Sequence, residues 1–276
     1  MITEMMQVHK HGFVKLLEVM GNDEEVENAA RISYGEGTRK VSQTRNLIRY
    51  LMRHKHTSPF EMCEVKFHLK LPIFVMRQLV RHRTANINEY SGRYSIMSDE
   101  FYLPAEADVQ EQSKSNNQGR GKDLDEPNKM LVLGRMVAIT DQAKECYRQI
   151  VDPTPLDGFY ENFKGIAREL ARTVLPVSNY TECIWKIDLN NFFHFAKLRM
   201  DAHAQKEIQD YGNAMYELVK PHFPICCESF EDYILNSKTF SAKEMEIIKD
   251  NLNGSWTMDK YGLSERESKE FLEKLN

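Results

Sequence analysis

The chain has 276 residues, of which 41 % are hydrophobic and 28 % are charged, and its formal net charge is -4. A soluble globular protein of this size buries a full core without disulfides or a structural metal. The negative net charge disfavours a nucleic-acid-binding surface that extends over the whole chain.

The first predicted elements are a strand and two helices. Residues 13–19 predict a short strand, and the residues after it are typical of a turn. Asn22 or Asp23 then caps a helix that extends to about residue 33. A second helix is expected over residues 42–52, because its apolar side chains fall on one helical face.

A longer strand is predicted over residues 63–71, where apolar and polar side chains alternate. The apolar side, which includes Val65 and Phe67, faces a core, and the polar side faces solvent or an interface. Pro72 suits the first turn of the next helix, predicted over residues 73–80. That helix carries a run of basic residues at its C-terminal end.

The second half of the chain is mostly helical. Residues 104–125 are polar and contain glycine, so they predict a long loop that is either disordered or a lid. Beyond the loop we expect four helices, one strand, and two short helical segments near the C-terminus capped by Ser241 and Ser264. The helices cover residues 126–150, 157–173, 190–198 and 203–220, and the strand covers 180–187. Strands mixed irregularly with many helices indicate an α+β fold, with a mixed or antiparallel sheet packed against helices in one large domain.

The cysteines and the N-terminus indicate the compartment. Five cysteines lie scattered along the chain and form no C-x-x-C pair, so neither a disulfide framework nor a structural zinc site is expected. The N-terminus lacks the apolar segment of a signal peptide, and no run of roughly 20 apolar residues is present. We therefore expect a cytoplasmic protein that does not contact a membrane.

A dense basic cluster is the strongest chemical feature. Arg77, Arg81, Arg83 and Arg93 lie with His82 within seventeen residues of an acidic chain. Guanidinium groups donate paired hydrogen bonds to phosphate and carboxylate oxygens, so the cluster predicts an anion site. The alternative is a solvated basic loop that ends a helix and is favoured by the helix dipole.

The spacing of this cluster resembles a known signature. Arg81-His82-Arg83, seven further residues and then Ser91 resemble the motif of flavin-dependent thymidylate synthases, with Gln78 and Arg93 flanking it. Three more segments are similar to other blocks of that family, one before the motif and two after it, in the family's order. They cover residues 54–61, 171–176 and 198–208. The resemblance covers roughly residues 10–235, and four ordered blocks are more specific than one short pattern.

The resemblance implies an activity and an assembly. Members of the family are homotetramers that bind FAD at subunit interfaces and convert dUMP to dTMP. Methylene-tetrahydrofolate would donate the carbon and NADPH would reduce the flavin, while no nucleic acid partner is implied. A synthase domain would span residues 1–237, and residues 238–276 would form a C-terminal helical extension.

The resemblance also assigns roles to single residues. The flavin-binding positions would be His56, Ser58, Arg81, His82, Arg83, Thr84, Glu89, Asp188, Asn190, His194 and His203. The dUMP-binding positions would be Gln78, Arg81, Glu89, Tyr90, Ser91, Gly92, Arg93, Arg172 and Arg199. Arg199 would be the catalytic residue, because a guanidinium beside the N3/O2 edge of uracil stabilises negative charge pushed into the ring.

Ser91 has a second interpretation as a nucleophile. A serine nucleophile needs an adjacent general base, and the local sequence supplies Glu89 and arginines. A hydrogen bond from Ser91 to phosphate or sugar is the simpler role. Cys226 and Cys227 lack the neighbouring histidine of the cysteine-dependent thymidylate synthases, so we expect buried, inert thiols.

Three other functions stay open at the level of sequence. A metal-dependent hydrolase would take ligands from His54, His56, His68, His82, His194 and His203, although no H-E-x-x-H pattern occurs. A nucleic-acid-binding module would use the arginine cluster, against the overall acidity and the lack of aromatic platforms. A family member that has lost activity is the third, but the four arginines Arg81, Arg93, Arg172 and Arg199 are all present.

Overall fold

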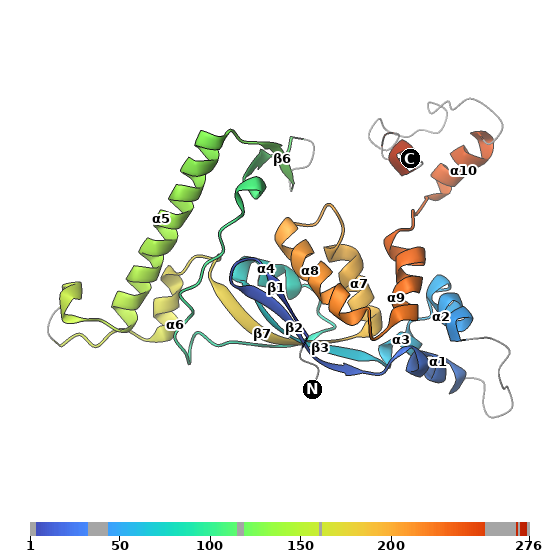
Figure 1. Ribbon diagram of the computed structural model, residues 1–276, viewed down its shortest axis with the longest axis horizontal. Coiled ribbons are helices and arrows are strands. Elements are labelled where there is room, and N and C mark those ends of the chain that lie inside the picture. The colour runs from blue at the N-terminus through green and yellow to red at the C-terminus, as the bar shows by residue number, and fades with distance from the viewer. Residues whose placement is uncertain are drawn as a thin grey trace. The chain divides into compact units, whose positions relative to one another are not determined.

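The structure is a computed structural model that describes residues 4–32, 44–114, 119–159, 162–251, 269 and 271–274. The chain divides into two compact units, Met1–Ser229 and Phe230–Asn276. The first unit combines a five-stranded sheet and a two-stranded hairpin with helices, which confirms the predicted α+β class (Figure 1). Among the described helices, none has the length and apolar character needed to cross a membrane.

A five-stranded sheet with the order β1-β2-β3-β7-β4 forms the centre of the first unit. Its strands are β1 (Met5–Val8), β2 (Gly12–Met20), β3 (Glu64–Pro72), β7 (Tyr180–Asp188) and β4 (Asn86–Glu89). Every pairing in it is antiparallel, so the antiparallel form of the predicted sheet is the observed one. β2, β3 and β7 match the three predicted strands within two residues, whereas the short strands β1 and β4 were not predicted.

One face of the sheet is covered by helices. The helices of this unit are α1 (Asp23–Arg31), α2 (Thr44–Arg53), α3 (Ser58–Glu61), α4 (Ile73–Leu79), α5 (Glu126–Val151), α6 (Arg168–Ala171), α7 (Leu189–Arg199), α8 (Lys206–Val219) and α9 (Pro224–Phe230). Helices α4, α7 and α8 contact the central strands, as Figure 1 shows.

The core lies between this face and α7. Phe67 of β3 is fully buried, and its ring centroid lies 6.0 Å from that of Phe192 in α7. Trp185 of β7 lies 5.3 Å from Phe195, one helical turn farther along α7. Burial of such aromatic side chains is the main favourable term for packing α7 on the sheet. This packing fixes the helix whose last residue is Arg199.

Local sequence explains where several helices begin. Asn22 caps α1, since its side chain accepts a hydrogen bond of 3.0 Å from the amide of Glu25. Asp188 caps α7 in the same way through the amide of Asn191. Pro72 differs from its prediction, because it ends β3 and serves as the cap of α4 instead of lying within the first turn.

The helix predicted over residues 157–173 is wrong. The structure has a 3-10 turn at Pro155–Asp157, then the short α6 and a second 3-10 turn at Arg172–Val174. Gly158 and Gly165 adopt left-handed φ angles of 75° and 90°, which a helix does not allow. A Cβ at Gly165 would lie 2.5 Å from the carbonyl oxygen of Val151, so the chain passes too close to α5 for a helix here.

The loop predicted over residues 104–125 contains a small antiparallel hairpin. Its strands are β5 (Gln110–Gln112) and β6 (Arg120–Asp123). Neither strand has the apolar alternation that marks a strand in sequence, so local pattern gave no signal. The hairpin depends instead on contacts to other parts of the fold, described below.

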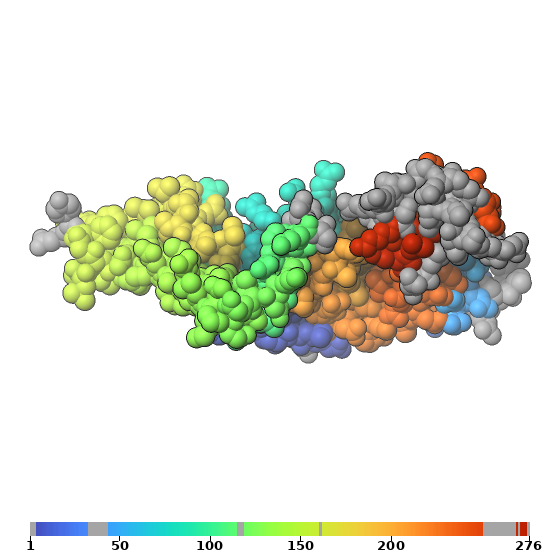
Figure 2. Space-filling view, turned by 90° about the horizontal axis from the view of Figure 1, so that it is seen from above, coloured from blue at the N-terminus to red at the C-terminus, as the bar shows by residue number. Residues whose placement is uncertain are grey.

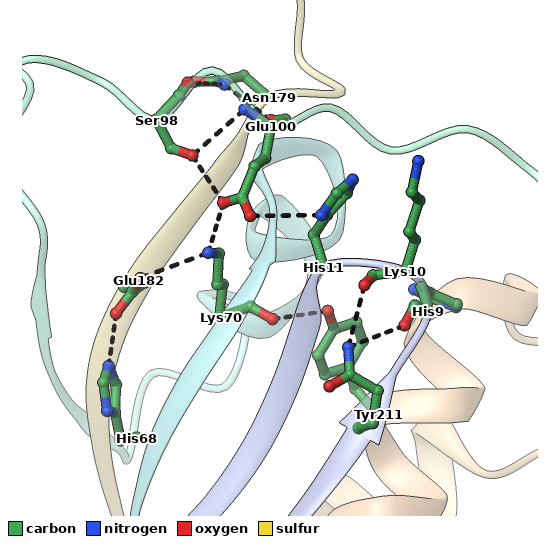
Figure 3. A network of polar contacts seen from close by, with 11 residues as sticks. His9, Lys10, His11, His68, Lys70, Ser98, Glu100, Asn179, Glu182 and Tyr211 are labelled. Atoms are coloured by element: carbon green, nitrogen blue, oxygen red, sulfur yellow. Dashed lines mark hydrogen bonds and ion pairs between the residues drawn. The ribbon is translucent and has the colours of Figure 1, made fainter.

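A polar network joins the sheet to the segment after β4 (Figure 3). Lys70 of β3 forms an ion pair of 2.5 Å with Glu100 and a longer one of 3.9 Å with Glu182 of β7. His68 binds Glu182 at 2.8 Å, and His11 approaches Glu100 at 3.3 Å. The network holds residue 100 against the sheet and so fixes the end of the loop that follows β4 and carries Gly92 and Arg93.

The second unit contains α10 (Ala242–Asn251). Ser241 and Glu244 form a reciprocal capping box at its start, as predicted for Ser241. The other predicted cap, Ser264, lies outside the described residues.

Candidate active site

The basic motif lies on the turn between α4 and β4. Helix α4 ends at Leu79, and the turn places His82 inward with 8 % of its surface exposed. Arg81 and Arg83 on either side are exposed. Within the described parts of the chain, neither guanidinium has an acidic partner. Free cations in an acidic protein suit an anionic ligand, so these residues fit the diphosphate of FAD.

The buried histidine of the motif holds Arg199. The Nε of Arg199 donates a hydrogen bond of 3.0 Å to Nε2 of His82, and its Nη2 donates one of 3.3 Å to the carbonyl oxygen of Gln78. Burial, together with the nearby charge of Arg199 and with His194, lowers the pKa of His82 to about 4. His82 is therefore neutral at physiological pH, which leaves Nε2 free to accept.

A cavity of about 640 Å³ opens beside Arg199. Gln78, His203 and Gln205 line it together with Arg199. The side chains of Gln78 and Gln205 are joined by a hydrogen bond of 2.5 Å. Burial lowers the pKa of Arg199, yet a guanidinium stays charged at any physiological pH. The cavity thus combines one fixed cation with amide groups that can bind a polar ring.

A second group of predicted residues surrounds Gly92. A Cβ at Gly92 would lie 2.7 Å from Sδ of Met97 and 3.2 Å from Cδ of Arg172, so a larger residue here would displace these two side chains. The amide of Arg93 donates to the hydroxyl of Ser91 at 3.4 Å. Arg93 and Arg172 therefore project from neighbouring backbone segments, as a pair of cations for one anion would require.

Two carboxylates among the predicted binding residues have hydrogen-bond partners within the chain. Glu89 accepts a hydrogen bond of 2.9 Å from the hydroxyl of Thr181 in β7. Asp188 caps α7 with both carboxylate oxygens, which bind the amide and the side chain of Asn191. Each of these carboxylates is thus held in one orientation at an end of a strand. Tyr90 is similarly held, since its hydroxyl donates to the carbonyl oxygen of Ile96 at 2.7 Å.

The remaining predicted flavin residues are spread over the chain. Ser58 begins α3, and His56 precedes it with its ring 5.9 Å from that of Tyr50. His194 lies on α7 with its ring 6.2 Å from that of His82. His203 is 84 % exposed and is bound to Asp201 through both its amide and Nδ1. Thr84 and Asn190 lie on the turn after α4 and on the first turn of α7.

The histidines and cysteines have structural surroundings. Over the described ranges, no group of three or more histidine, cysteine, aspartate or glutamate side chains is placed to hold a metal ion. Cys226 and Cys227 are fully buried, and burial raises the pKa of the Cys226 thiol. A cysteine nucleophile must form a thiolate, and this buried environment disfavours the thiolate.

Several residues that shape the site were not singled out from the sequence. Gln205 binds Gln78, Thr181 binds Glu89, and Glu169 forms an ion pair of 3.0 Å with Arg93. Gln205 belongs to the block 198–208 that carries the resemblance, so that block contained a signal for it. Thr181 and Glu169 become recognisable only when β7 pairs with β4 and α6 packs beside residue 93.

A family model and curated relatives match almost the whole chain. The model described as thymidylate synthase complementing protein matches residues 15–225. The flavin-dependent thymidylate synthase of Ehrlichia ruminantium is 46 % identical over 265 residues, which cover 96 % of this chain and 86 % of the relative. The enzyme of the same description from Rickettsia prowazekii is 44 % identical over 278 residues, covering 99 % of this chain and 94 % of the relative.

A solved structure agrees with the sequence relatives. The UMP/dUMP methylase PolB from Streptomyces cacaoi bound with 5-Br UMP superposes with a TM-score of 0.69 at 31 % identity. The match covers 82 % of this chain and 97 % of that one. By sequence over nearly its full length and by fold, the chain belongs to the flavin-dependent thymidylate synthase family.

Proposed function

We propose that this chain converts dUMP to dTMP with FAD as cofactor, methylene-tetrahydrofolate as carbon donor and NADPH as reductant. The observation that carries the proposal is the Arg199 guanidinium, held by neutral His82 and by the carbonyl of Gln78 at the wall of a cavity. The five free cysteines suit a reducing compartment, and we place the reaction in the cytoplasm.

Two pairs of arginines would each bind a different anion. Arg93 and Arg172, beside the close-packed turn at Gly92, would bind the phosphate of dUMP with the hydroxyl of Ser91. Arg93 is paired with the exposed Glu169, and an exposed pair of this kind is weak enough for a phosphate dianion to displace. Arg81 and Arg83, which face solvent, would bind the diphosphate of FAD.

Arg199 would activate the uracil ring. Its Nε and Nη2 are held by His82 and Gln78, which leaves the Nη1 edge for the N3/O2 edge of uracil. A positioned cation in a partly buried cavity stabilises negative charge more strongly than water does. Electron density pushed onto the pyrimidine makes its C5 nucleophilic, so this charge stabilisation is the contribution of the protein.

The residues of the motif fit a flavin, with Glu89 and Asp188 held by Thr181 and Asn191 as hydrogen-bond acceptors nearby. When bound and reduced, FAD supplies the hydride and mediates transfer of the one-carbon unit. His56, Ser58, Thr84, Asn190, His194 and His203 would complete its binding site in the assembled protein.

A homotetramer with shared sites is part of the proposal. The long helix α5 presents apolar side chains to solvent in the single chain, including Met130, Leu131 and Ile139. Figure 2 shows α5 in green as a broad outer surface of the first unit. Exposed apolar residues on more than one side of a helix favour its burial against other subunits. The synthase domain would span residues 1–237, with residues 238–276 as an extension outside the chemistry.

The first experiment is an absorbance spectrum of the purified protein, followed by NADPH and dUMP without oxygen. We expect oxidised-flavin bands that bleach faster when dUMP is present, and dTMP after methylene-tetrahydrofolate is added. A protein that stays colourless after incubation with FAD would overturn the proposal. A flavoprotein that bleaches but forms no dTMP would correspond to a member of the family that has lost the methyl transfer.

A further inference from the structure

The hairpin β5–β6 and the loop between α7 and α8 enclose a second cavity of about 510 Å³. It shares His203, Ala204 and Gln205 with the cavity beside Arg199. The two cavities therefore adjoin along this loop. We call the second one the hairpin cavity, and its far wall consists of residues 108, 110–113, 119 and 120.

Arg120 fixes this wall to the active-site side of the fold. Its guanidinium forms an ion pair with Glu207, in the first turn of α8, and a second of 3.1 Å with Asp108. Glu207 is 2 % exposed and also accepts a hydrogen bond of 2.7 Å from the hydroxyl of Tyr102. A buried charge needs such partners, so the hairpin is anchored where α8 follows the site loop. Figure 2 shows the green hairpin surface beside the orange surface of α8.

The lining of the hairpin cavity is rich in amides. Gln110 donates its NH₂ to Asp123 at 2.9 Å, Gln112 donates to the carbonyl of Gly119 at 3.1 Å, and Gln209 donates to the carbonyl of Ala204 at 2.6 Å. Each amide donates one N–H group to a protein acceptor, and its carbonyl oxygen can accept a hydrogen bond from a ligand. The cavity therefore offers mainly hydrogen-bond acceptors.

The cations at this cavity are already neutralised. Arg120 is paired with Glu207 and Asp108, and Lys206 is paired with Asp210. Phosphate or carboxylate ligands would have to break these pairs, one of which is buried. A neutral group with N–H donors matches the lining better than an anion does.

We propose, on the basis of the proposed function, that the hairpin cavity is the subsite for the amino-substituted heterocycle of a co-substrate. Such a ring presents N–H donors along one edge, which the carbonyl oxygens of Gln110, Gln112 and Gln209 accept. Two co-substrates carry this chemistry, the reduced pterin of the folate and the adenine of NADPH. The uracil and the phosphate of dUMP remain in the cavity beside Arg199.

The test replaces two acceptors on the hairpin wall. Gln110→Leu combined with Gln112→Leu keeps the size of the side chains and removes their carbonyl oxygens, together with the amide donors to Asp123 and to the carbonyl of Gly119. Gln142→Leu, on the exposed surface of α5, is the matched control. Calorimetric titration of each FAD-loaded variant with tetrahydrofolate, NADP⁺ and dUMP gives three dissociation constants, and a thermal melt checks folding. NADP⁺ carries the same adenine as NADPH but does not reduce the flavin.

The double variant is expected to bind one of the two amino-heterocycle co-substrates roughly 10- to 50-fold more weakly, since two hydrogen bonds are lost. Its affinity for dUMP should match that of the control, while its melting temperature should fall by no more than the loss of two exposed hydrogen bonds in the hairpin allows. Loss confined to tetrahydrofolate assigns the subsite to the pterin, and loss confined to NADP⁺ assigns it to the adenine. Unchanged affinity for both, or equal weakening of all three ligands, would overturn the subsite.

A second variant tests the anchor of the wall. Arg120→Gln removes the ion pairs with Glu207 and Asp108, so it should weaken the same co-substrate as the double variant. Weakening of dUMP alone would contradict the subsite. If the unmodified protein binds neither FAD nor dUMP, the proposed function itself fails. If the unmodified protein binds both but the variants bind the co-substrates normally, only the subsite fails.

Discussion

Arg199 is held by two acceptors that come from one helix and the turn after it. Its Nε binds His82 and its Nη2 binds the carbonyl of Gln78, both on the segment that includes α4. A long arginine side chain loses much rotamer freedom when it is fixed in this way. Because these contacts are already present in the single chain, the guanidinium is fixed before any ligand binds, as its proposed role requires.

Replacement of Arg199 separates catalysis from cofactor binding. Arg199→Ala should lower kcat by on the order of 100- to 1000-fold, because the developing charge on the ring loses its cation. The flavin absorbance of the purified variant should be unchanged. Arg199→Lys keeps a charge but loses the fixed Nε–His82 bond, and it should recover only part of the rate. Normal turnover of Arg199→Ala would show that another group activates the ring.

His82 predicts a defined pH dependence of stability. Burial and the adjacent Arg199 lower the pKa of His82 from 6.5 to about 4, so the unfolded chain binds a proton that the folded chain rejects between these values. The free energy of unfolding should therefore fall by on the order of 3 kcal/mol as the pH drops from 6.5 to 4. Above pH 6.5 this contribution is fully present.

The comparison is with His82→Gln, whose amide can accept from Arg199 but does not titrate. Denaturant unfolding of both proteins at several pH values isolates the histidine, since other acid-sensitive groups are common to both. The difference in their free energies of unfolding should change across this window. A constant difference from pH 7 to pH 4 would contradict the buried, neutral histidine.

At the scale of elements, the loop after β4 depends on one glycine. Gly92→Ala would place a Cβ 2.7 Å from Sδ of Met97 and 3.2 Å from Cδ of Arg172. The side chains of Met97 and Arg172 must then move, which should cost about 1 kcal/mol in the free energy of unfolding and, through Arg172, weaken dUMP binding roughly tenfold. Denaturant unfolding and titration with dUMP measure the two effects.

Gly134→Ala is the matched control for that change. It lies within α5, where a Cβ meets no atom within 4 Å, so alanine should stabilise the protein by about 0.5–1 kcal/mol. If both variants bound dUMP equally well, the close approach at Gly92 would have no part in the phosphate site.

Regular elements with a clear period were predicted well from the sequence. The strand β3 and the helix α5 agree within one residue at each end, because alternation and a capping aspartate mark them locally. The hairpin β5–β6 and the short strand β4 were missed. Their few residues carry no period, and they are stabilised by pairing with β7 or by Arg120 and Glu207.

At the scale of the whole molecule, α5 governs the proposed assembly. Met130 is 70 % exposed and Ile139 is 58 % exposed in the single chain. Ile139→Asp should dissociate the tetramer and lower flavin content together, because a charge buried at a subunit interface is costly and the sites are shared. Sedimentation velocity and flavin absorbance measure the two effects.

Asn213→Asp, exposed on α8 and away from α5, is the control and should leave the tetramer intact. A native protein that sediments as a monomer with full flavin content would show that each chain holds its own site. A tetramer unaffected by Ile139→Asp would show that the subunit interface does not include this part of α5.

The sequence by itself determined the chemistry and most of the regular structure. The motif at residues 81–91 and three ordered blocks led to the family that the relatives confirm, because these residue types are contiguous or regularly spaced. Three of the central strands and most long helices followed from period and capping. Such signals are local, and they persist whatever the rest of the chain does.

Only the tertiary structure decided which predicted residues act together within one chain. It joined His82 to Arg199, 117 positions apart in the sequence, and Gln78 to Gln205. It also replaced the predicted helix over residues 157–173 and turned part of a predicted loop into the wall of a second cavity. The reason is physical: these arrangements depend on burial and on hydrogen bonds between distant segments, which exist only after the sheet and α7 have packed together.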